Sequence, residues 1–536
     1  MSAWQSVTRQ FDLLMHRLRV GHGIPATILP ITDKFFSAAR DSFEQREQRH
    51  ITAEAARVAE RYAGRDIELV VTRWPGSSAP SRFVEVRGGS IEPGIKCIAH
   101  EPSAEAIREL ASYLRDYTEK LRTVPIRHIL EVLNEGSLLW LDENYDKRAL
   151  AIEAIARKTG FSREMVIHSM DLEMRSSRGA DMWRTLFTEL GNPLVLDAAG
   201  MVPSGEAPAA AYGPELTAGI FSSNIPALPH LTYMRSAAVK SPVLGKVSTQ
   251  EPIFAGLYID TLIELDPIIG NGMAAVWFAG GTVDCERALF EQADHVIAYG
   301  GDRSLNALSK LLPTNTNKTF HGHRMGIGMV CLDDVTAEER RALARDIAYD
   351  VAVFDGQACL APQVYFFETT DHTRALELTS MIGAELELMG QWLPRRRLSL
   401  RAAAARKQIT DHWEVEAACD GDCDLLPAHI GDVPEWAALV TRGEYRPREV
   451  GDRLIHIHVV NNLDDVVPTM KPVARYLQNV AIFAPRQRRQ KLAAAFSSLG
   501  ASRITRPGLM PTPSMMWHHD GRSCLSDLVR WSDISV

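Results

Sequence analysis

Short apolar segments alternate with amphipathic stretches over much of the chain. The apolar runs have the length of buried strands, roughly four to eight residues, and the stretches between them repeat apolar side chains at helical spacing. Strands that alternate with helices predict parallel sheets covered on both faces. Because the alternation occurs twice, we predict two α/β domains in tandem. The expected strands are Leu216–Phe221, Ala237–Val243, Met273–Phe278, His295–Ala298 and Met325–Leu332 in the first, and Val364–Glu368, Leu454–Val460 and Val480–Phe483 in the second.

Helical periodicity is clear between these runs and before them. The expected helices are Ile253–Ile263, Cys285–Glu291 and Ser304–Leu311 in the first domain, and Thr373–Leu388 and Asp464–Gln478 in the second. Further upstream, Ala104–Lys120 carries Ile107, Leu110 and Leu114 on one helical face. The segment Val202–Pro214 is rich in Pro, Gly and Ala, which predicts a loop or linker.

Composition narrows the class of protein. Of the 536 residues, 46% are hydrophobic and 24% are charged, which is typical of a globular chain. The net charge of −8 provides no basic field for nucleic acid, and seven scattered cysteines do not form a disulfide scaffold. No window reaches the roughly 18 unbroken apolar residues of a membrane helix, and the N-terminus lacks the apolar stretch of a secretory signal. We therefore expect a cytoplasmic protein without a membrane span or a nucleic-acid partner.

Several common catalytic fingerprints are missing. The chain contains no GxGxxG after a strand, no GxxxxGK[ST] loop, no GxSxG elbow and no HExxH. Cys419 and Cys423 stand in an acidic CDGDC loop without the second Cys or His pair of a zinc site. We predict no metal site, and any nucleotide site must be of a less usual kind.

The turn before Val364 holds the strongest candidate for chemistry. Gly356, Gln357 and Cys359 lie between two apolar runs and are followed by Pro362. Such a turn presents a thiol at the edge of a sheet, where backbone amides lower its pKa and face an oxyanion formed by attack on a carbonyl. The alternative is a buried structural cysteine, because free Cys is among the most buried residue types.

Three other turns carry suitable groups after predicted strands. Asn224 has an amide able to donate to an oxyanion, and Lys246 suits a ribose or phosphate contact. Gly300 and Gly301 stand between a strand and a helix, where small residues let a pyrophosphate approach the backbone. Each of these residues also has an ordinary explanation as part of a turn or a surface.

Taken in order, these motifs resemble the aldehyde dehydrogenase superfamily and, within it, the LuxC-type acyl-CoA reductases. The resemblance runs from about Ile126 to Val536 and includes the segments Val276–Gly301, Phe354–Gln363 and His518–Val529. It implies that Cys359 is the nucleophile and that Asn224 donates to the oxyanion. The cofactor-binding residues that it implies are Lys246, Ser248, Gly300, Gly301 and Ser304.

The resemblance also implies an architecture and an activity. We expect an aldehyde-dehydrogenase-like α/β fold with an N-terminal mixed region at 1–125, a Rossmann-like NAD(P)-binding domain at 126–330, a catalytic cysteine domain at 331–485 and a C-terminal segment at 486–536 that returns to the cofactor and oligomerisation region. The expected reaction is NADPH-dependent reduction of an acyl-CoA or carrier-protein thioester to an aldehyde, with NADH as the other possible donor. A homo-oligomer, dimer or tetramer, is expected.

One departure from the superfamily bears on the reaction. Hydrolytic aldehyde dehydrogenases hold a glutamate base before the cysteine, whereas Phe320–Gly328 contains no acid. Without that base, water is poorly activated against an acyl-enzyme, which favours thioester reduction. His321 or His323 is an alternative base, so oxidation of an aldehyde to a free acid stays open as a second hypothesis. The third is a non-catalytic partner of a carrier protein.

Two further histidines are candidates for proton transfer. His456 and His458 are two residues apart in a predicted strand and so share one face of the sheet. His519 lies in the His-Asp-Gly block near the C-terminus. We expect His458 and His519 to donate a proton to the departing thiolate or to the forming aldehyde oxygen.

Overall fold

The structure is a computed structural model that describes residues 46–76, 79–88, 91–203, 205–427 and 434–535. The chain divides into two compact units, residues 1–53 and 54–536. Residues 46–53 of the first unit are helical. The N-terminal stretch that we predict to lack a secretory signal lies outside the described residues. The second unit contains all the elements named below.

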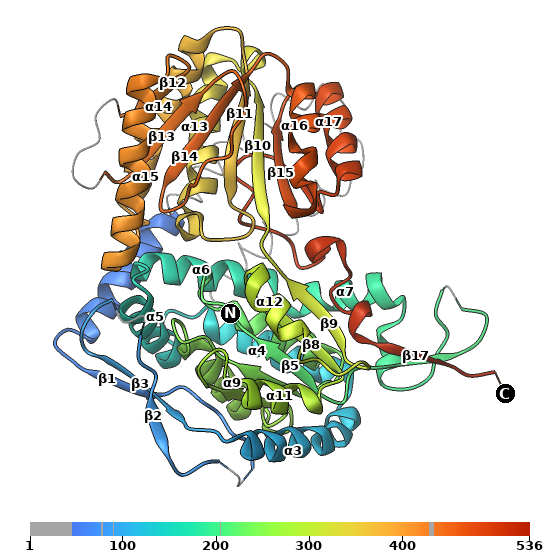
Figure 1. Cartoon of the computed structure of the whole chain (residues 1–536). Helices are drawn as coiled ribbons and strands as arrows, with labels where there is room; N and C mark the ends of the chain where they lie inside the picture. The colour runs from blue at the N-terminus through green and yellow to red at the C-terminus, as the bar shows by residue number, and fades with distance from the viewer. Residues whose placement is uncertain (1–45, 77–78, 89–90, 204, 428–433, 536) are drawn as a thin grey trace. The chain divides into compact units, whose positions relative to one another are not determined.

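A five-stranded parallel sheet, the cofactor sheet, has the order β7–β6–β5–β8–β9. β5 comes first in the chain, β6 and β7 follow on one side of it, and β8 and β9 lie on the other (Figure 1). The winding therefore reverses between β5 and β8, and ligands of open α/β sheets bind beyond the carboxyl ends of the strands at such a point. The strands are β5 (Thr217–Ile220), β6 (Val243–Lys246), β7 (Met273–Val276), β8 (His295–Tyr299) and β9 (Asn317–His321), and the helices are α8 (Pro229–Ala238), α9 (Ile253–Leu265), α10 (Pro267–Gly270), α11 (Val283–Glu291) and α12 (Asp302–Ser309).

A seven-stranded sheet, the cysteine sheet, has the order β12–β13–β14–β11–β10–β15–β16 and is parallel except for β12. Helices α13 and α14 cover one face and α16 and α17 the other, each face with its own apolar core (Figure 1). The strands are β10 (Met325–Cys331), β11 (Pro362–Glu368), β12 (Cys423–Leu426), β13 (Ala437–Thr441), β14 (Leu454–Val460), β15 (Leu477–Phe483) and β16 (Arg503–Thr505). The helices are α13 (Ala337–Ala352), α14 (His372–Gly390), α15 (Leu400–Cys419), α16 (Val466–Met470) and α17 (Arg486–Leu499).

The segment before the cofactor sheet is mostly helical and packs onto that sheet. Ile107, Leu110 and Leu114, the predicted apolar face, are fully buried and share one core with β5 and β6. A small sheet of order β1–β3–β2 precedes these helices. The elements are β1 (Ile67–Val70), β2 (Phe83–Glu85), β3 (Ile95–His100), α3 (Ala104–Thr123), α4 (Ile126–Trp140), α5 (Asp146–Thr159), α6 (Arg163–Ser176), α7 (Gly179–Leu190) and η1 (Pro193–Leu196).

Two predicted strands differ from the structure. Ala237–Val243 contains the end of α8 and a turn at Lys240, whose φ is 60°, so that the strand begins only at Val243. Met325–Leu332 does not belong to the cofactor sheet. It forms β10 in the middle of the cysteine sheet, because it pairs with β11 and β15. Apolar periodicity identifies a strand, but it does not select the strand's partner.

Two predicted segments are also more complex than expected. Asp464–Gln478 is not one helix, because Pro468 and Pro472 lack the N–H that a continuous helix needs, and it is divided into short turns around α16. The predicted linker Val202–Pro214 contains β4 (Ala209–Tyr212), which pairs with β17 (Arg530–Asp533) from the far end of the chain. Local composition does not show such a long-range pairing.

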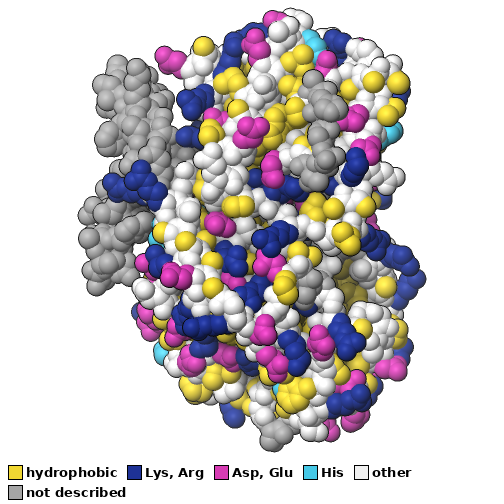
Figure 2. All heavy atoms as spheres, turned by 90° about the vertical axis from the view of Figure 1, so that its left-hand side faces the viewer, with side chains coloured by type: hydrophobic (Ala, Val, Ile, Leu, Met, Phe, Trp, Pro, Cys, Tyr) yellow, Lys and Arg dark blue, Asp and Glu magenta, His cyan; other side chains and the backbone are white. Residues whose placement is uncertain are grey.

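Surface charge and cysteine state agree with the composition. Figure 2 shows Lys and Arg side chains interspersed with Asp and Glu on the face that it presents, without a basic patch. All seven cysteines are free thiols. None of the helices in the described part of the chain is long and apolar enough to cross a membrane.

Candidate active site

The carboxyl ends of neighbouring strands bring three predicted residues to one edge of the cofactor sheet. Asn224 follows β5, Lys246 ends β6 and Gly300 follows β8. β5 pairs with both β6 and β8 in parallel, so the three turns lie at the same edge. This edge is also the switch point of the sheet, where a nucleotide is expected.

The residues at this edge fit a dinucleotide. Gly301 precedes α12 without a side-chain cap, and no atom lies within 4 Å of the position that its Cβ would take. In the first turn of α12, the N–H groups of Asp302 and Arg303 have no carbonyl partner within the helix and suit a phosphate. Ser304 belongs to the same turn, but its own N–H already donates to Gly301 O at 2.9 Å, so only its hydroxyl is offered to a ligand. Lys246 Nζ lies 5.0 Å from the centre of the Phe278 ring, and burial lowers the pKa of Lys246. Ser248 lies just after Lys246, and its Oγ accepts from Gln250 N at 3.2 Å.

The turn that carries Cys359 is shaped by left-handed backbone. Phe354, Asp355 and Gly356 have φ values of 56°, 49° and 71° within η3 (Val353–Gly356). The buried carboxylate of Asp355 accepts from Arg453 Nε at 2.9 Å and from the backbone N–H of Arg396 at 2.9 Å. Non-glycine residues adopt this conformation at a cost, so the turn persists because buried contacts hold it.

Asn224 and the cysteine turn meet directly. Asn224 Nδ2 donates to the carbonyl of Gln357 at 3.1 Å, and its Oδ1 accepts from Ser222 Oγ at 2.6 Å. Helix α6 contacts both loops, because Ser169 Oγ donates to Pro226 O at 2.8 Å and Phe354 N lies 3.3 Å from a methionine sulfur of α6. The amide predicted to hold an oxyanion therefore contacts Gln357, which is two positions before the predicted nucleophile.

Cys359 is partly exposed, between the buried residues Ala358 and Leu360. Burial raises the pKa of its thiol to about 12, the charge of Asp520 raises that pKa further, and its own backbone N–H and Arg324 lower it. The thiol is therefore protonated at neutral pH, and its attack on a carbonyl requires a base to take the proton.

A buried carboxylate near Cys359, Asp520, was not among the predicted residues. Its Oδ2 lies 2.7 Å from His321 Nδ1, and its Oδ1 accepts from Arg324 Nε at 2.7 Å and from Gln478 Nε2 at 2.7 Å. These contacts hold the pKa of Asp520 far below its usual range, so it is ionised. The sequence signal was its position beside His519 in the His-Asp-Gly block.

Four aromatic rings stack beside this carboxylate. Ring centres are 4.7 Å apart for Tyr299 and His321, 3.9 Å for His321 and His519, and 4.7 Å for His519 and Trp517. Burial is the main cause that lowers the pKa values of His321 and His519, so both imidazoles are neutral at pH 7. The structure thus places the predicted residue His519, and His321, which the sequence named as an alternative base, beside Asp520.

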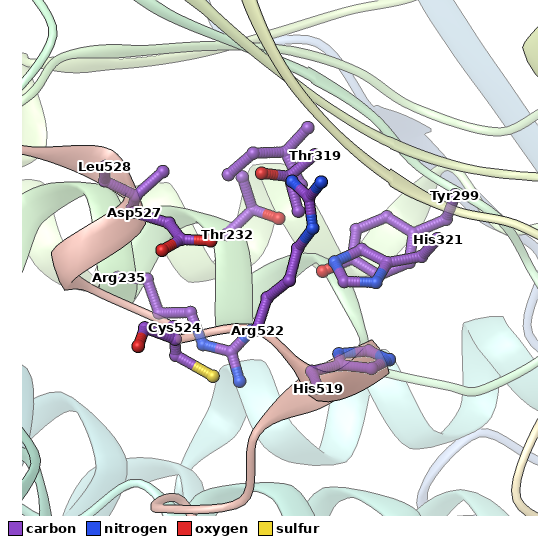
Figure 3. Close-up of a pocket in the computed structure, with 12 residues that line it drawn as sticks. Thr232, Arg235, Tyr299, Thr319, His321, His519, Arg522, Cys524, Asp527 and Leu528 are labelled. Atoms are coloured by element: carbon purple, nitrogen blue, oxygen red, sulfur yellow. The ribbon is translucent and has the colours of Figure 1, made fainter. Parts of the chain in front are cut away.

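A small cavity adjoins the ring stack, as Figure 3 shows. Its volume is about 20 Å³, enough for roughly one water molecule. His321 and Tyr299 line it from the cofactor sheet, Arg235 from α8, and His519 and Cys524 from the C-terminal segment. A cavity of this volume is too small for an acyl chain.

His458 does not join these groups. It lies on β14 and pairs with Phe366 of β11. Phe366 is four residues beyond Pro362, where β11 begins, so His458 lies about 13 Å along the sheet from the end that follows the cysteine turn. Its Nδ1 lies 2.8 Å from Thr441 Oγ1, which also contacts His456 Nε2 at 2.9 Å. As predicted, His456 and His458 share one face, but they form a buried cluster away from the cysteine turn.

His321, His519 and Asp520 are also the one group of described residues whose ligand atoms lie close enough together for a metal ion. Both carboxylate oxygens of Asp520 already have partners, and the guanidinium of Arg324 contacts one of them. A further cation here has to displace these donors and approach a fixed positive charge. The chemistry of this cluster therefore favours proton transfer over metal binding.

Comparison with known proteins identifies the family. Residues 121–531 match the family of acyl-CoA reductases (LuxC). The chain is 21% identical over 420 residues to a long-chain acyl-protein thioester reductase of Photorhabdus luminescens, covering 78% of this chain and 83% of that protein. A protein of the same description from Aliivibrio fischeri is 22% identical over 414 residues, covering 76% and 81%.

Solved structures share the fold. Aldehyde dehydrogenase 21 of Physcomitrella patens superimposes with a TM-score of 0.67 at 12% identity, covering 88% of this chain and 98% of that one. The NADP-dependent glyceraldehyde-3-phosphate dehydrogenase of Bacillus halodurans, complexed with NADP, gives 0.62 at 14% identity, covering 85% and 96%. The predicted aldehyde-dehydrogenase-like α/β fold is confirmed, and the chain belongs to the LuxC family of acyl-CoA reductases.

Proposed function

We propose that this protein reduces a fatty-acyl thioester to the aldehyde through an acyl-Cys359 intermediate, with NADPH as the reductant and NADH as the other possible donor. The observation that carries the proposal is the hydrogen bond from Asn224 Nδ2 to Gln357 O at 3.1 Å. It joins the nucleotide edge of one sheet to the thiol-bearing turn of the other. Membership of the family makes the chain an aldehyde-forming acyl reductase.

In the proposed reaction, the sulfur of Cys359 attacks the thioester carbonyl after its proton has passed to a base. The Asn224 amide turns from Gln357 to the oxyanion, and the backbone N–H of Cys359 donates to the same oxygen. The bond to the donor sulfur breaks, and His519, one of the four stacked rings, is the candidate to donate a proton to the forming aldehyde oxygen. A nicotinamide, when bound, would supply the hydride that converts the acyl-cysteine to the aldehyde and the Cys359 thiolate.

The cofactor assignment is supported by the nucleotide edge of the cofactor sheet. Lys246 and Ser248 suit the ribose and its phosphate, while Gly300, Gly301 and Ser304 suit the pyrophosphate. A solved relative by fold is complexed with NADP. Direct titration with NADPH and NADH, followed by tryptophan fluorescence, tests the preference.

Oxidation of an aldehyde to a free acid is a second candidate because of Glu173 on α6. Burial raises the pKa of this carboxyl to about 7, and its charge raises the pKa of Cys359. A carboxyl of this kind is a possible base for water. Incubation with aldehyde and NADP+ distinguishes the two, because the reductase requires an added thiol in reverse, whereas the oxidase forms acid without one.

The acyl donor is proposed to be acyl-CoA, which the description of the family names, or an acylated carrier protein, as the relatives described as acyl-protein thioester reductases suggest. We also propose a homo-oligomer, dimer or tetramer, formed through the strands β4 and β17. A two-stranded pair is marginally stable alone, and large apolar side chains are exposed on and around it. They are Phe187, Leu194, Met201, Tyr212, Trp531 and Ile534. A reducing cytoplasm suits the free cysteines.

The deciding experiment offers acyl-CoA and acyl-carrier substrates with each cofactor and identifies the products by mass spectrometry. Aldehyde formation with loss of activity in Cys359→Ala, while NADPH binding persists, supports the proposal. Full turnover by that variant removes the mechanism. Lack of turnover with every donor, together with tight carrier binding, points to a non-catalytic partner instead.

A further inference from the structure

We propose that His321, oriented by Asp520, is the base that takes the proton of Cys359 and returns it to the departing thiol. This inference rests on the proposed function and adds the residue that makes acylation possible. His321 is a catalytic residue in this scheme, and Asp520 is a positioning residue.

Two neighbouring strands hold Asp520 and the cysteine turn together. Near the start of β10, Arg324 Nε donates to Asp520, and Gly326 N donates to Ala361 O at 3.1 Å. At the start of β15, Gln478 Nε2 donates to Asp520, and Asn479 Nδ2 donates to Leu360 O at 3.1 Å. On each strand, one residue contacts the carboxylate of Asp520, and a residue one or two positions later contacts the backbone just after Cys359. Asp520 and the cysteine turn therefore lie at the same end of the sheet.

The orientation of His321 leaves one nitrogen for chemistry. Its Nδ1 lies 2.7 Å from the ionised Asp520, so this nitrogen carries the proton that is donated to the carboxylate. Nε2 is then the basic nitrogen, and no hydrogen bond within the described part of the chain occupies it. The rings of Tyr299 and His519, at 4.7 and 3.9 Å, prevent the imidazole from turning.

Asp520 occupies the left-handed backbone region, which is uncommon for residues other than glycine. Its φ is 55°, in the left-handed region, within η6 (His519–Gly521). The pairing of its two oxygens with His321, Arg324 and Gln478 holds it there. Such local strain clusters at sites where a side chain has to be aimed.

The surroundings of His321 keep its imidazole in the neutral form, which can accept a proton. Asp520 raises its pKa, while burial and the guanidinium groups of Arg235 and Arg324 lower it, and the net direction is downward. Tyr299 from β8 and His519 from the C-terminal segment stack on its two faces, and Arg522, Cys524 and Asp527 of the C-terminal segment line the same cavity. At neutral pH the imidazole is therefore neutral and able to accept a proton.

The proton and the bonds balance without an oxidant. The proton of Cys359 Sγ passes to His321 Nε2 as the sulfur–carbon bond forms. The carbon–sulfur bond of the donor then breaks, and the same proton passes from Nε2 to the donor sulfur. The products are acyl-Cys359 and a free donor thiol, and His321 is neutral again.

The test measures acylation alone, in full-length protein without nicotinamide. A long-chain acyl-CoA is mixed with the protein, the reaction is quenched at short times, and the Cys359 adduct is measured by intact mass over a range of pH. In the wild type, the rate should be constant near neutral pH and fall in acid as His321 becomes protonated. In His321→Gln, it should be at least about 100-fold lower at pH 7 and rise about tenfold per pH unit, because thiolate must then form without a base.

Asp520→Asn is the second variant, and it should also lower the rate and change the pH profile. His128→Gln is the matched control, because His128 forms an exposed pair with Asp266 at the same distance of 2.7 Å. A wild-type rate and profile in folded His321→Gln, or in Asp520→Asn if the first variant does not fold, overturns the inference. If the wild type itself gives no adduct at Cys359, the proposed function fails as well, so the two failures are distinct.

Discussion

Asn224 Nδ2 donates a hydrogen bond to Gln357 O at 3.1 Å, across 133 positions of the chain. The donor follows the central strand of the cofactor sheet, and the acceptor precedes Cys359 in the cysteine sheet. In the proposed reaction, an amide in this place would reach the carbonyl that Cys359 attacks after a small rotation. The geometry of the site leads to four testable predictions, and the exposed apolar surface leads to a fifth.

Replacement of Asn224 by Ala should lower the rate of Cys359 acylation by about 100- to 1,000-fold, because one donor to the oxyanion is lost. The measurement is the quenched acylation assay with acyl-CoA. Ser223→Ala is the control, since the Ser223 hydroxyl neighbours Asn224 but donates to Gln250 Oε1 at 3.2 Å and not to the cysteine turn. An acylation rate in Asn224→Ala equal to that of the control contradicts the role.

Replacement of Lys246 by Ala should raise the KM for NADPH about tenfold or more and leave acylation unchanged, because in the proposed site the ammonium contacts the cofactor and not the acyl group. Lys318→Ala is a matched control. Lys318 also lies over a phenylalanine ring, at 5.6 Å from Phe320, but on the outer strand β9. Equal KM values for the two variants would count against the nucleotide site.

Replacement of Arg453 by Met should destabilise the fold by about 3–5 kcal/mol, because the carboxylate of Asp355 is left buried without its charged partner. The side chains of Arg453 and Asp355 are 1% and 0% exposed. Urea denaturation of the single variants and of the Asp355→Asn, Arg453→Met pair measures the coupling. The double variant should lose less free energy of unfolding than the sum of the two single variants. If the losses are additive, the two residues do not stabilise the turn together.

Replacement of Glu173 by Gln should stabilise the protein at pH 8 and have little effect at pH 5. Burial raises the pKa of this carboxyl from 4.5 to about 7 in the folded state. Between these two pH values the carboxyl is ionised in the unfolded chain but still protonated in the folded one, so the free energy of unfolding falls as the pH rises. The gain in the free energy of unfolding should be at most about 3 kcal/mol. Glu119→Gln, exposed on α3, should show no such dependence; an equal gain at both pH values refutes the explanation.

Replacement of Trp531 by Ser should lower the molar mass in solution, because this side chain is 39% exposed beside β4 and offers apolar area to a second copy. Light scattering after gel filtration measures the mass. Leu400→Ser is the control, since Leu400 is 93% exposed on the distant helix α15. A wild type that is monomeric at every concentration removes the proposed oligomer.

The sequence by itself determined most of the elements and the identity of the main reactive groups. The apolar periods of Leu454–Val460 and Ala104–Lys120 predict a strand and a helix, because side-chain spacing within an element is a local property. The order of Asn224, Lys246, Gly300 and Cys359 along the chain was sufficient to indicate a superfamily. Both kinds of signal are present in linear sequence.

Tertiary structure alone decided which of these groups act together. β10 lies in the cysteine sheet because of its partners, and His458 lies with Thr441 rather than with Cys359. His321 and Asp520 are 199 positions apart, and they meet because the C-terminal segment returns to the cofactor sheet and Arg324 and Gln478 hold the carboxylate there. Pairing over such separations depends on strand register and on packing of the whole chain, which no local pattern of residues contains.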